Sequence, residues 1–480
     1  MKKLSELYNV NSDVEIKGIK INSKEVEIGD LFICTKGVTA DRHDFIDMAI
    51  ENGASAIVVG KDGIKANVPI IRVPDPNKEL PLLCARFYDH PEDKLKIIGV
   101  TGTDGKTSVS TIIQTLLGKN TCGYIGTNGR SCAAFDRETS NTTPDSDKLY
   151  EYFDEFVKQG CNAVATEASS EAFFRGRIET ISYDVSVITN VTSEHLNIHG
   201  SFENYLDCKC QLFRQTKKSG FSVLNKDDKY YDHIKQFCQG KVLTYGIDKD
   251  NDLQIVSFKS LPDHTEVIYK YGKEKINIYS PLLGDFNVYN LAAAMLVALE
   301  MGISVEIIKK RLPSVIIPGR MEMLKTNNNY YVMVDYAHTP NGIKQLLKFV
   351  HTLNINRSIV VQGVAGERDY LKRPIMGKTL VNNASYVIFT YEDPRSENPI
   401  DIINMMIKDI KDDHDNYEII VDRHDAIKKA VNMAKEKDIV LILGKGNETY
   451  QKLKNEVIYF NDIEEAYKAI EAKNEKSNNN

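Results

Sequence analysis

The sequence predicts an α/β protein with three domains: a small N-terminal α/β domain, a central parallel sheet of the P-loop type flanked by helices, and a C-terminal Rossmann-like α/β domain. Three observations support this prediction. The chain has 480 residues, more than one ordinary hydrophobic core accommodates. Short β-branched runs alternate with helical periodicity along its length, and one glycine-rich segment lies between such a run and a helical pattern.

The first two predicted domains cover residues 1–92 and 93–317. In the first domain, strand-like runs are predicted at 16–21, 56–59 and 70–73, and one helical pattern at 45–52. Glycine-bearing turns separate these segments. In the second domain, a buried strand at 96–100 leads into the glycine-rich segment and then a helix at 108–117. Further strands, at 163–166 and 185–188, alternate with helical stretches.

The third predicted domain covers residues 318–470 and begins where Pro318-Gly319-Arg320 interrupts a helical segment. Its predicted strands are apolar and short enough to be buried in a sheet, at 331–334, 358–361, 386–390 and 439–443. Residues 471–480 are polar and have nothing to bury, so they are predicted to form a disordered tail.

Composition excludes several classes of protein. A net charge of −6 without any lysine-arginine block argues against nucleic acid as a partner. No apolar stretch approaches the length of a membrane span, and no apolar run follows the first lysines. The eight cysteines are scattered without paired spacing, which predicts reduced thiols. We therefore expect a cytoplasmic monomer that neither binds nucleic acid nor inserts into a membrane.

The segment GVTGTDGKTS, residues 99–108, predicts a phosphate-binding loop. A strand, a turn with Gly102 and Gly105, and a helix that starts near Lys106 direct backbone N–H groups at an anion. Lys106 adds a positive charge, and Thr107 adds a hydroxyl for Mg²⁺. The usual pattern has a further glycine where Val100 stands, so the loop is shortened.

The shortened loop resembles that of the ATP-dependent Mur ligases, and further motifs of that family occur in the family's order from about residue 20 to 450. They are Asn141-Thr142-Thr143-Pro144, Glu167-Ala168-Ser169-Ser170, the segment 195–200, Gly284-Asp285-Phe286-Asn287, the segment 318–322, the segment 334–340, Gly366-Glu367-Arg368-Asp369 and Gly444-Lys445-Gly446. Glu392-Asp393-Pro394-Arg395 is similar to the D-N-P-R motif of members that add meso-diaminopimelate, with the first two positions changed.

The resemblance implies a ligase that adds the third residue of the peptidoglycan stem peptide. Such an enzyme joins a diamino acid to a UDP-N-acetylmuramoyl-dipeptide through an acyl phosphate, and it needs ATP and Mg²⁺. It implies an ATP site of Gly102, Thr103, Asp104, Gly105, Lys106, Thr107, Ser108, Asn287, Arg320 and Asp335.

The implied metal ligands are Thr107, Glu167 and His195, and Lys106, Glu167, His195 and Lys209 are the implied catalytic residues. Lys209 stands where the family carries a lysine carbamylated by CO₂. Taken alone, Glu167 is equally typical of a structural acid, His195 of a structural histidine and Lys209 of an exposed helical lysine. The family pattern has aspartates where Glu194 and Asn197 stand.

The implied binding site for the UDP-substrate consists of Ser23, Asn141, Thr142, Thr143, Ser169, Arg175 and Arg177, although two arginines so close together also suit a solvated face. The implied amino-acid site consists of Arg368, Glu392, Asp393, Pro394, Arg395, Gly444 and Glu448. Two arginines fit a substrate with a distal carboxylate better than they fit lysine.

Departures at Asp104, Glu171, Glu194 and Asn447 leave other interpretations open. The chain could add L-lysine, or it could be a Mur-type ligase that has been repurposed for another acid and amine. Folylpolyglutamate synthetase shares the ATP core but explains neither the first domain nor residues 392–395. A paralogue that only binds nucleotide would be expected to lack Lys106, Glu167 or Lys209, and all three are present.

Overall fold

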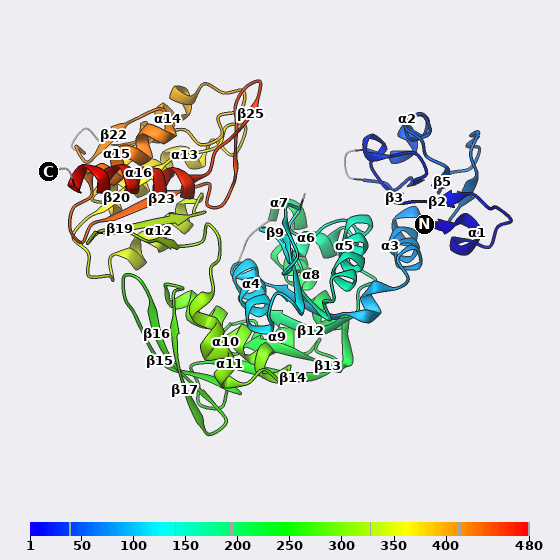
Figure 1. Cartoon of the computed structure of the whole chain (residues 1–480), viewed down its shortest axis with the longest axis horizontal. Helices are drawn as coiled ribbons and strands as arrows, with labels where there is room; N and C mark the ends of the chain where they lie inside the picture. The colour runs from blue at the N-terminus through cyan, green and yellow to red at the C-terminus, as the bar shows by residue number, and fades with distance from the viewer. Residues whose placement is uncertain (38–39, 140, 193–195, 327, 411–413, 479–480) are drawn as a thin grey trace. The chain divides into compact units, whose positions relative to one another are not determined.

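The computed structural model describes residues 1–480 except 38–39, 140, 193–195, 327, 411–413 and 479–480 (Figure 1). The chain divides into two compact units. Unit 1 comprises residues 1–255, 270–274 and 289–308, and unit 2 comprises 256–269, 275–288 and 309–480. Each unit is described by itself below. Within the described part of the chain, no helix combines the length and the apolar character needed to cross a membrane.

The N-terminal part of unit 1 contains a parallel sheet in the order β3-β4-β5-β6. Leu31, Ile33 and Val58 pack with residues of α3 on one face, while Phe32 and Ile57 pack with residues of α2 on the other. Both central strands are therefore buried on two sides, which explains their continuous apolar runs. The elements are β1 (Lys2–Lys3), α1 (Leu4–Leu7), β2 (Glu15–Ile16), β3 (Ile19–Lys20), η1 (Ser23–Glu25), β4 (Leu31–Ile33), η2 (Arg42–Phe45), α2 (Ile46–Glu51), β5 (Ala56–Val59), β6 (Ile70–Arg72), α3 (Pro76–Phe87) and η3 (Pro91–Lys94).

The central sheet has the order β10-β9-β8-β11-β7-β12-β13-β14-β15-β16-β17. From β8 to β15 neighbouring strands run parallel, which confirms the predicted parallel sheet. Its strands are β7 (Lys96–Thr101), β8 (Cys122–Gly126), β9 (Gly129–Ser131), β10 (Asp136–Arg137), β11 (Ala163–Glu167), β12 (Tyr183–Ile188), β13 (Thr216–Asn225), β14 (Lys241–Gly246), β15 (Leu253–Ser260), β16 (Thr265–Tyr271) and β17 (Glu274–Ser280). The helices are α4 (Lys106–Leu117), α5 (Ser146–Lys158), α6 (Ser170–Phe174), α7 (Leu196–His199), α8 (Phe202–Arg214), α9 (Tyr231–Lys235), α10 (Asp285–Glu300) and α11 (Val305–Arg311).

Strand β7 lies between β11 and β12, and its apolar residues Ile97, Ile98 and Val100 are fully buried. The register places Glu167 opposite Val100 and Ile188 opposite Thr101. All three strands therefore end at the same edge of the sheet, which is where open parallel sheets bind ligands.

Unit 2 contains a second sheet in the order β18-β19-β23-β20-β21-β22, parallel except for β18. One face packs with residues of α12, α13 and α14, and the other with residues of α15 and α16, as a Rossmann-like domain requires. The elements are η4 (Leu312–Ser314), β18 (Glu322–Leu324), β19 (Tyr331–Asp335), α12 (Pro340–Val350), β20 (Ser358–Gln362), α13 (Lys372–Asn383), β21 (Tyr386–Phe389), α14 (Pro399–Ile407), β22 (Tyr417–Ile419), α15 (Arg423–Met433), β23 (Ile439–Leu443), β24 (Tyr450–Lys452), β25 (Val457–Tyr459) and α16 (Asp462–Asn478).

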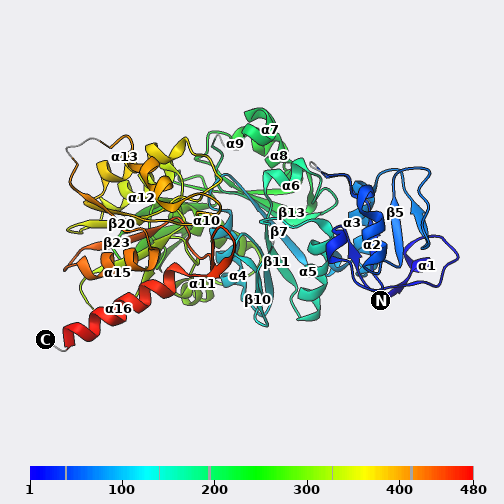
Figure 2. The ribbon, with the colours of Figure 1, turned by 90° about the horizontal axis from the view of Figure 1, so that it is seen from above.

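The end of α16 differs from the predicted disordered tail at 471–480, because the helix continues to Asn478. It runs beside α15 (Figure 2). Ala469 and Ile470 are buried, and Lys473 Nζ donates a hydrogen bond to the Val431 carbonyl of α15 at 2.7 Å. Alanine, glutamate and lysine are good helix formers, so a docked helix propagates through a polar segment that buries little itself.

A buried acid at the start of α5 provides a test of the packing in unit 1. Asp147 is 5% exposed, and one of its carboxylate oxygens, Oδ1, has no hydrogen-bond partner. Burial, with the nearby Asp145 charge, raises the pKa of Asp147 to about 6. A carboxylate near a helix N-terminus gains only about 0.3–1 kcal/mol. Desolvation dominates here, so the charged form costs stability.

We predict that Asp147→Asn stabilises the protein at neutral pH. The native state favours protonated Asp147, so this contribution to stability is present below about pH 4 and is lost as pH rises through 6. The difference in free energy of unfolding between the variant and the wild type should increase by about 2–3 kcal/mol in favour of the variant from pH 4 to pH 7.5. Urea denaturation at both pH values measures this. Asp425→Asn, an exposed acid in the first turn of α15, is the control. An equal pH response of both variants would contradict the explanation.

Candidate functional site

The loop between β7 and α4 leaves the start of the helix open to an anion. Gly105 is the N-cap of α4 with a φ of 84°, and no side chain caps the helix. A Cβ on Gly105 would lie 2.5 Å from Asn290 Oδ1, and a Cβ on Gly102 would lie 1.8 Å from Thr189 Oγ1. Both positions need glycine, and the first N–H groups of α4 remain available to a phosphate.

The segment after β12 holds the loop in place. Thr103 N donates to the Asn190 carbonyl at 2.9 Å, and Asp104 N donates to Asn190 Oδ1 at 3.1 Å. In return, Thr192 N donates to Thr103 Oγ1 at 2.9 Å. These contacts fix the loop without a ligand, so its N–H groups are preorganised.

Two lysines converge on one backbone carbonyl of the loop. Lys209 Nζ donates to the Gly102 carbonyl at 2.6 Å, and Lys106 Nζ donates to the same carbonyl at 3.0 Å and to that of Thr103 at 2.8 Å. Lys209 is 1% exposed, and its ammonium group lies 4.3 Å from the centroid of the Tyr205 ring. The interpretation as an exposed helical lysine is therefore wrong. Two neighbouring cations favour an anion at this point.

Glu167 is fully buried at the end of β11 and accepts hydrogen bonds from neutral donors. Its Oε1 accepts from Tyr124 OH at 2.7 Å and from Thr127 N at 2.9 Å, and its Oε2 accepts from Thr127 Oγ1 at 3.2 Å. Thr107 lies in the first turn of α4, and the register of β11 with β7 brings both residues to the same sheet edge. Carboxylate and hydroxyl oxygens are the donors that Mg²⁺ prefers, so this pair fits the metal.

The predicted histidine ligand, His195, lies outside the described residues, as does Glu194. The roles of Tyr124, Thr127 and Asn190 were missed by sequence reasoning. The first two come from β8 and the turn that follows it, and no pattern in the sequence connects them to Glu167.

Several of the predicted UDP-substrate residues lie together beside Glu167. Thr143 Oγ1 donates to the Glu167 carbonyl at 2.7 Å and accepts from Ser169 N at 3.1 Å. Thr142 Oγ1 lies 3.0 Å from Thr127 Oγ1. Ser23 is buried in η1 and its hydroxyl contacts Met48 Sδ at 3.3 Å.

The two predicted arginines of this set have partners within the chain. Arg177 Nε pairs with Asp145 at 2.9 Å and Arg175 Nε pairs with Glu171 at 2.7 Å. Asn141 is exposed. Both pairs are partly exposed to solvent, and such pairs contribute little to stability.

Of the predicted nucleotide residues of unit 2, Arg320 and Asp335 lie near the start of β18 and the end of β19, and Asn287 lies in the first turn of α10. The Asp335 carboxylate accepts from Met321 N at 2.7 Å and from Ala337 N at 2.8 Å, and burial raises its pKa. The Arg320 guanidinium lies 4.7 Å from the centroid of the Tyr336 ring. Asn287 Nδ2 donates to the Leu283 carbonyl at 2.8 Å.

The predicted amino-acid residues gather where β21 and β23 end. Lys445 is fully buried, and its Nζ pairs with Asp393 Oδ1 at 2.8 Å and with Glu448 Oε2 at 2.9 Å. Arg395 follows Pro394 with a φ of 55° and donates its backbone N–H to the Lys452 carbonyl at 2.9 Å. A second buried ion pair, Arg423 with Asp462 at 2.6 Å, was missed because both residues are ordinary in the sequence. Arg368 is exposed, while Glu392 and Gly444 are buried.

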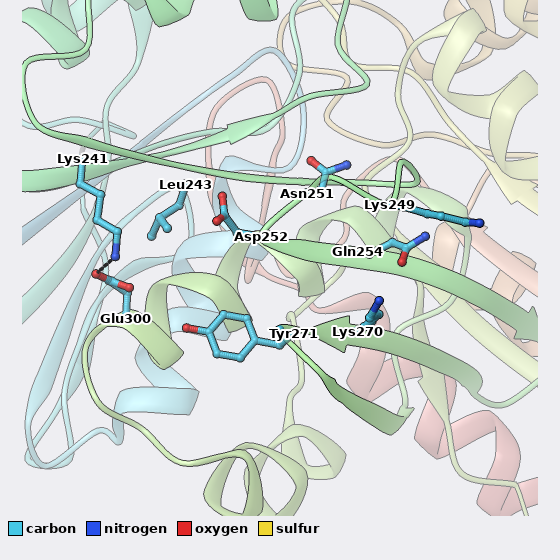
Figure 3. Close-up of a pocket in the computed structure, with 10 residues that line it drawn as sticks. Lys241, Leu243, Lys249, Asn251, Asp252, Gln254, Lys270, Tyr271 and Glu300 are labelled. Atoms are coloured by element: carbon cyan, nitrogen blue, oxygen red, sulfur yellow. Dashed lines mark hydrogen bonds and ion pairs between the residues drawn. The ribbon is translucent and has the colours of Figure 1, made fainter.

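A separate cavity of about 520 Å³ lies in unit 1 (Figure 3). Lys241 pairs with Glu300 at 2.6 Å at one end of it, and Lys249, Lys270 and Gln254 gather at the other. None of the predicted site residues lines this cavity.

We predict that Gly102→Ala lowers the affinity for ATP at least about tenfold, because the new methyl group would overlap Thr189 and displace the loop. Calorimetric titration with a non-hydrolysable ATP analogue measures the affinity. Gly160→Ala is the matched control, since Gly160 also has a positive φ, of 82°, but open space around its Cβ position. The control should cost only about 1 kcal/mol of stability and leave binding unchanged. Wild-type affinity in Gly102→Ala would show that this loop does not bind the nucleotide.

Comparison with known proteins agrees with this geometry. Residues 15–88 match the catalytic domain of the Mur ligase family, residues 100–298 match the Mur ligase middle domain, and residues 319–446 match the Mur ligase glutamate ligase domain. The UDP-N-acetylmuramoyl-L-alanyl-D-glutamate–2,6-diaminopimelate ligase of Clostridium perfringens is 37% identical over 98% of both chains, and that of Geobacillus thermodenitrificans is 38% identical over 95% of both.

Solved structures agree as well. A structure with the same ligase name superimposes with a TM-score of 0.70 and 29% identity, over 98% of this chain and 99% of its own. The MurF ligase of Thermotoga maritima in complex with ADP is 20% identical and shares the fold, with a TM-score of 0.66 over 97% of this chain and all of its own. On this evidence, the chain belongs to the Mur ligase family.

Proposed function

We propose that this protein joins meso-2,6-diaminopimelate to UDP-N-acetylmuramoyl-L-alanyl-D-glutamate, with ATP as the second substrate. The observation that carries the proposal is that Lys106 and Lys209 converge on the Gly102 carbonyl, in the loop that leads to the open N-terminus of α4, in a chain whose full-length relatives bear the name of this ligase. A carboxylate is a poor acyl donor, because its oxygen is a poor leaving group. Its conversion to an acyl phosphate by ATP lets the incoming amine displace phosphate.

The residues of unit 1 would supply charge and position. The N–H groups at the uncapped start of α4 and the Lys106 ammonium bind the phosphates. Thr107 and Glu167 hold Mg²⁺, which when bound neutralises charge on the phosphates. Thr142, Thr143 and Ser169 line the position of the acid that is activated.

The residues of unit 2 would complete the two remaining substrate sites. Asn287, Arg320 and Asp335 bind the nucleotide. Arg368 and Arg395 bind the distal carboxylate of the amino acid, and Glu448 accepts from its ammonium group. Gly444 completes this site at the end of β23, and the Glu392 carboxyl group occupies the space that a side chain at residue 444 would fill.

We assign these roles to three domains, with residues 1–92 for the UDP part, 93–317 for ATP and 318–470 for the amino acid. Ser23 belongs to the first. L-Lysine as the amino acid is the second candidate, since Asn447 departs from the histidine of the family pattern.

We predict that, of meso-diaminopimelate, L-lysine and L-ornithine, only the first gives product. The chain is incubated with Mg²⁺, ATP, UDP-N-acetylmuramoyl-L-alanyl-D-glutamate and one amino acid at a time, and mass spectrometry and phosphate release are the readouts. Lys106→Ala should lower kcat/KM at least about 100-fold, because it removes a charge that stabilises the phosphates. Lys119→Ala, an exposed lysine after the same helix, is the control. Product with L-lysine instead would favour the second candidate, and no phosphate release with any amino acid would refute the ligase.

We also propose that Lys209 is carbamylated. Its buried ammonium group shares the Gly102 carbonyl with Lys106, an arrangement in which two cations repel each other. Carbamylation forms an N–C bond between Lys209 Nζ and CO₂ with loss of two protons, one when the ammonium group becomes the attacking amine and one from the nitrogen after the bond has formed. It replaces one cation by an anion that pairs with Lys106 and helps to hold a metal ion.

The expected result in ¹³C-bicarbonate is a carbamate resonance in the NMR spectrum of the wild type and its absence in Lys209→Gln. Removal of CO₂ should lower activity about tenfold or more, because the anion near the phosphates is lost. Lys217→Gln, a partly exposed lysine paired with Asp184, is the control and should keep the resonance. The assignment fails if Lys209→Gln retains it too.

A further inference from the structure

Glu392 is the most deeply buried carboxyl group in the amino-acid site that has no partner. It is 8% exposed, lies three residues after the end of β21, and accepts no hydrogen bond and forms no ion pair with any residue that the structure describes. Its Oε2 atom lies 2.6 Å from the position of a Cβ on Gly444, and Gln362 Nε2 lies 3.1 Å from the same point. The carboxyl group therefore faces the edge at which β20 and β23 end.

The cations near Glu392 are committed to other acids. Lys445 is held by Asp393 and Glu448, at 2.8 and 2.9 Å. Arg423, on α15, pairs with Asp462 of α16 through Nε and Nη2, while its buried Nη1 has no hydrogen-bond partner among the described residues. An unpaired, buried carboxylate is unfavourable unless it binds a proton or a ligand.

The remaining titratable groups around Glu392 come from two further elements. They are Lys372 of α13 and Tyr336, which follows β19. Burial raises the pKa of Glu392 to about 7, against the lowering effect of Arg423 and Lys445, while Glu448 and Asp393 raise it further. Burial therefore favours the protonated form of this group.

The donors of two arginines in the proposed amino-acid site indicate which part of the substrate binds at this site. Arg395 Nε is buried and has no hydrogen-bond partner among the described residues, and Arg368 is exposed without an ion pair to any of them. Unused guanidinium donors call for a carboxylate. Glu448, which is more exposed than Glu392, is the better acceptor for an ammonium group.

Asp393 cannot supply a donor to that carboxylate. The asparagine of the D-N-P-R motif would offer an amide N–H at this position, whereas Asp393 is an acceptor and is tied to Lys445 and to Lys452 N at 3.3 Å. We propose that protonated Glu392 donates a hydrogen bond to the distal carboxylate of the amino-acid substrate, and that Asp393 does not contact this carboxylate. This inference rests on the proposed function, and it makes recognition of the substrate depend on pH.

The test compares KM for meso-diaminopimelate from pH 6.5 to 8.5 in the full chain with Glu392→Gln and with Glu456→Gln. Glu456 is an exposed glutamate in the turn between β24 and β25 and serves as the control. As pH rises, the wild type loses the donor and gains a repelling charge, so its KM relative to that of Glu392→Gln should rise about tenfold. The side-chain amide that Glu392→Gln introduces donates at every pH, whereas Glu456→Gln should follow the wild type. Titration of the substrate amine affects all three proteins alike and cancels in the ratio.

Binding and turnover separate the two proposals. Binding of meso-diaminopimelate is measured by calorimetry with the UDP-substrate and a non-hydrolysable ATP analogue present. Binding that weakens above pH 7 in the wild type but not in Glu392→Gln, without product formation, would support Glu392 and refute the ligase activity.

The inference is overturned if the ratio of the wild-type KM to that of Glu392→Gln does not change with pH, or if the wild type does not bind meso-diaminopimelate at either pH 6.5 or pH 8.5. It is also overturned if Glu392→Gln binds at least tenfold more weakly at every pH, which would show that the carboxylate binds an ammonium group. Circular dichroism and urea denaturation establish that the variant is folded.

Discussion

The parallel pairing of β7 with β11 and β12 is the constraint on which the site of unit 1 depends. It places Glu167, the last residue of β11, and Thr189, the first residue after β12, beside the end of β7. The loop after β7 must then close against Thr189, and only glycine fits at residue 102. Hydrogen bonds from the segment after β12 fix the rest of the loop. The anion site is therefore a property of three strands, and the glycine motif is the part of it that is visible in one stretch of sequence.

Unit 2 places its polar residues at the equivalent edge of its own sheet, but its charges are mostly matched in buried pairs. Lys445 lies between two acids, and Arg423 is bound by Asp462. Burying single charges would cost several kcal/mol each, so these pairs keep the edge polar at a tolerable cost. Glu392 forms no ion pair with any described residue, so its protonation state is the one that can respond to a substrate.

The sequence was sufficient for the strands and for the glycine turn between β7 and α4, because apolar runs and glycines are local signals. Strands β7, β20 and β23 lie where the apolar runs predict them. The hydrogen bonds of Glu167 were not predictable, because Tyr124 and Thr127 lie about 40 residues away in the sequence and reach it only through the pairing of β8 with β11.

The structure differs from the sequence-based expectations at Lys209 and at the end of α16, and in both places the sequence contains a signal that composition alone does not show. Lys209 lies in the helical stripe of Leu206, Cys210 and Phe213, all of which are buried, so its burial follows from helical periodicity. The segment after Ile470 has the composition of a disordered tail, but its helix propensity and the docking of α16 extend the helix.

The contact between Glu392 and Gly444 links the mutational histories of the two positions. Any side chain at 444 would overlap the glutamate carboxyl group, and a φ of 111° there disfavours other residues in any case. A shorter acid at 392 would withdraw from Gly444 and leave a space at the sheet edge. The aspartate that the D-N-P-R motif has at this position would therefore leave a space beside residue 444 that the longer glutamate of this chain fills.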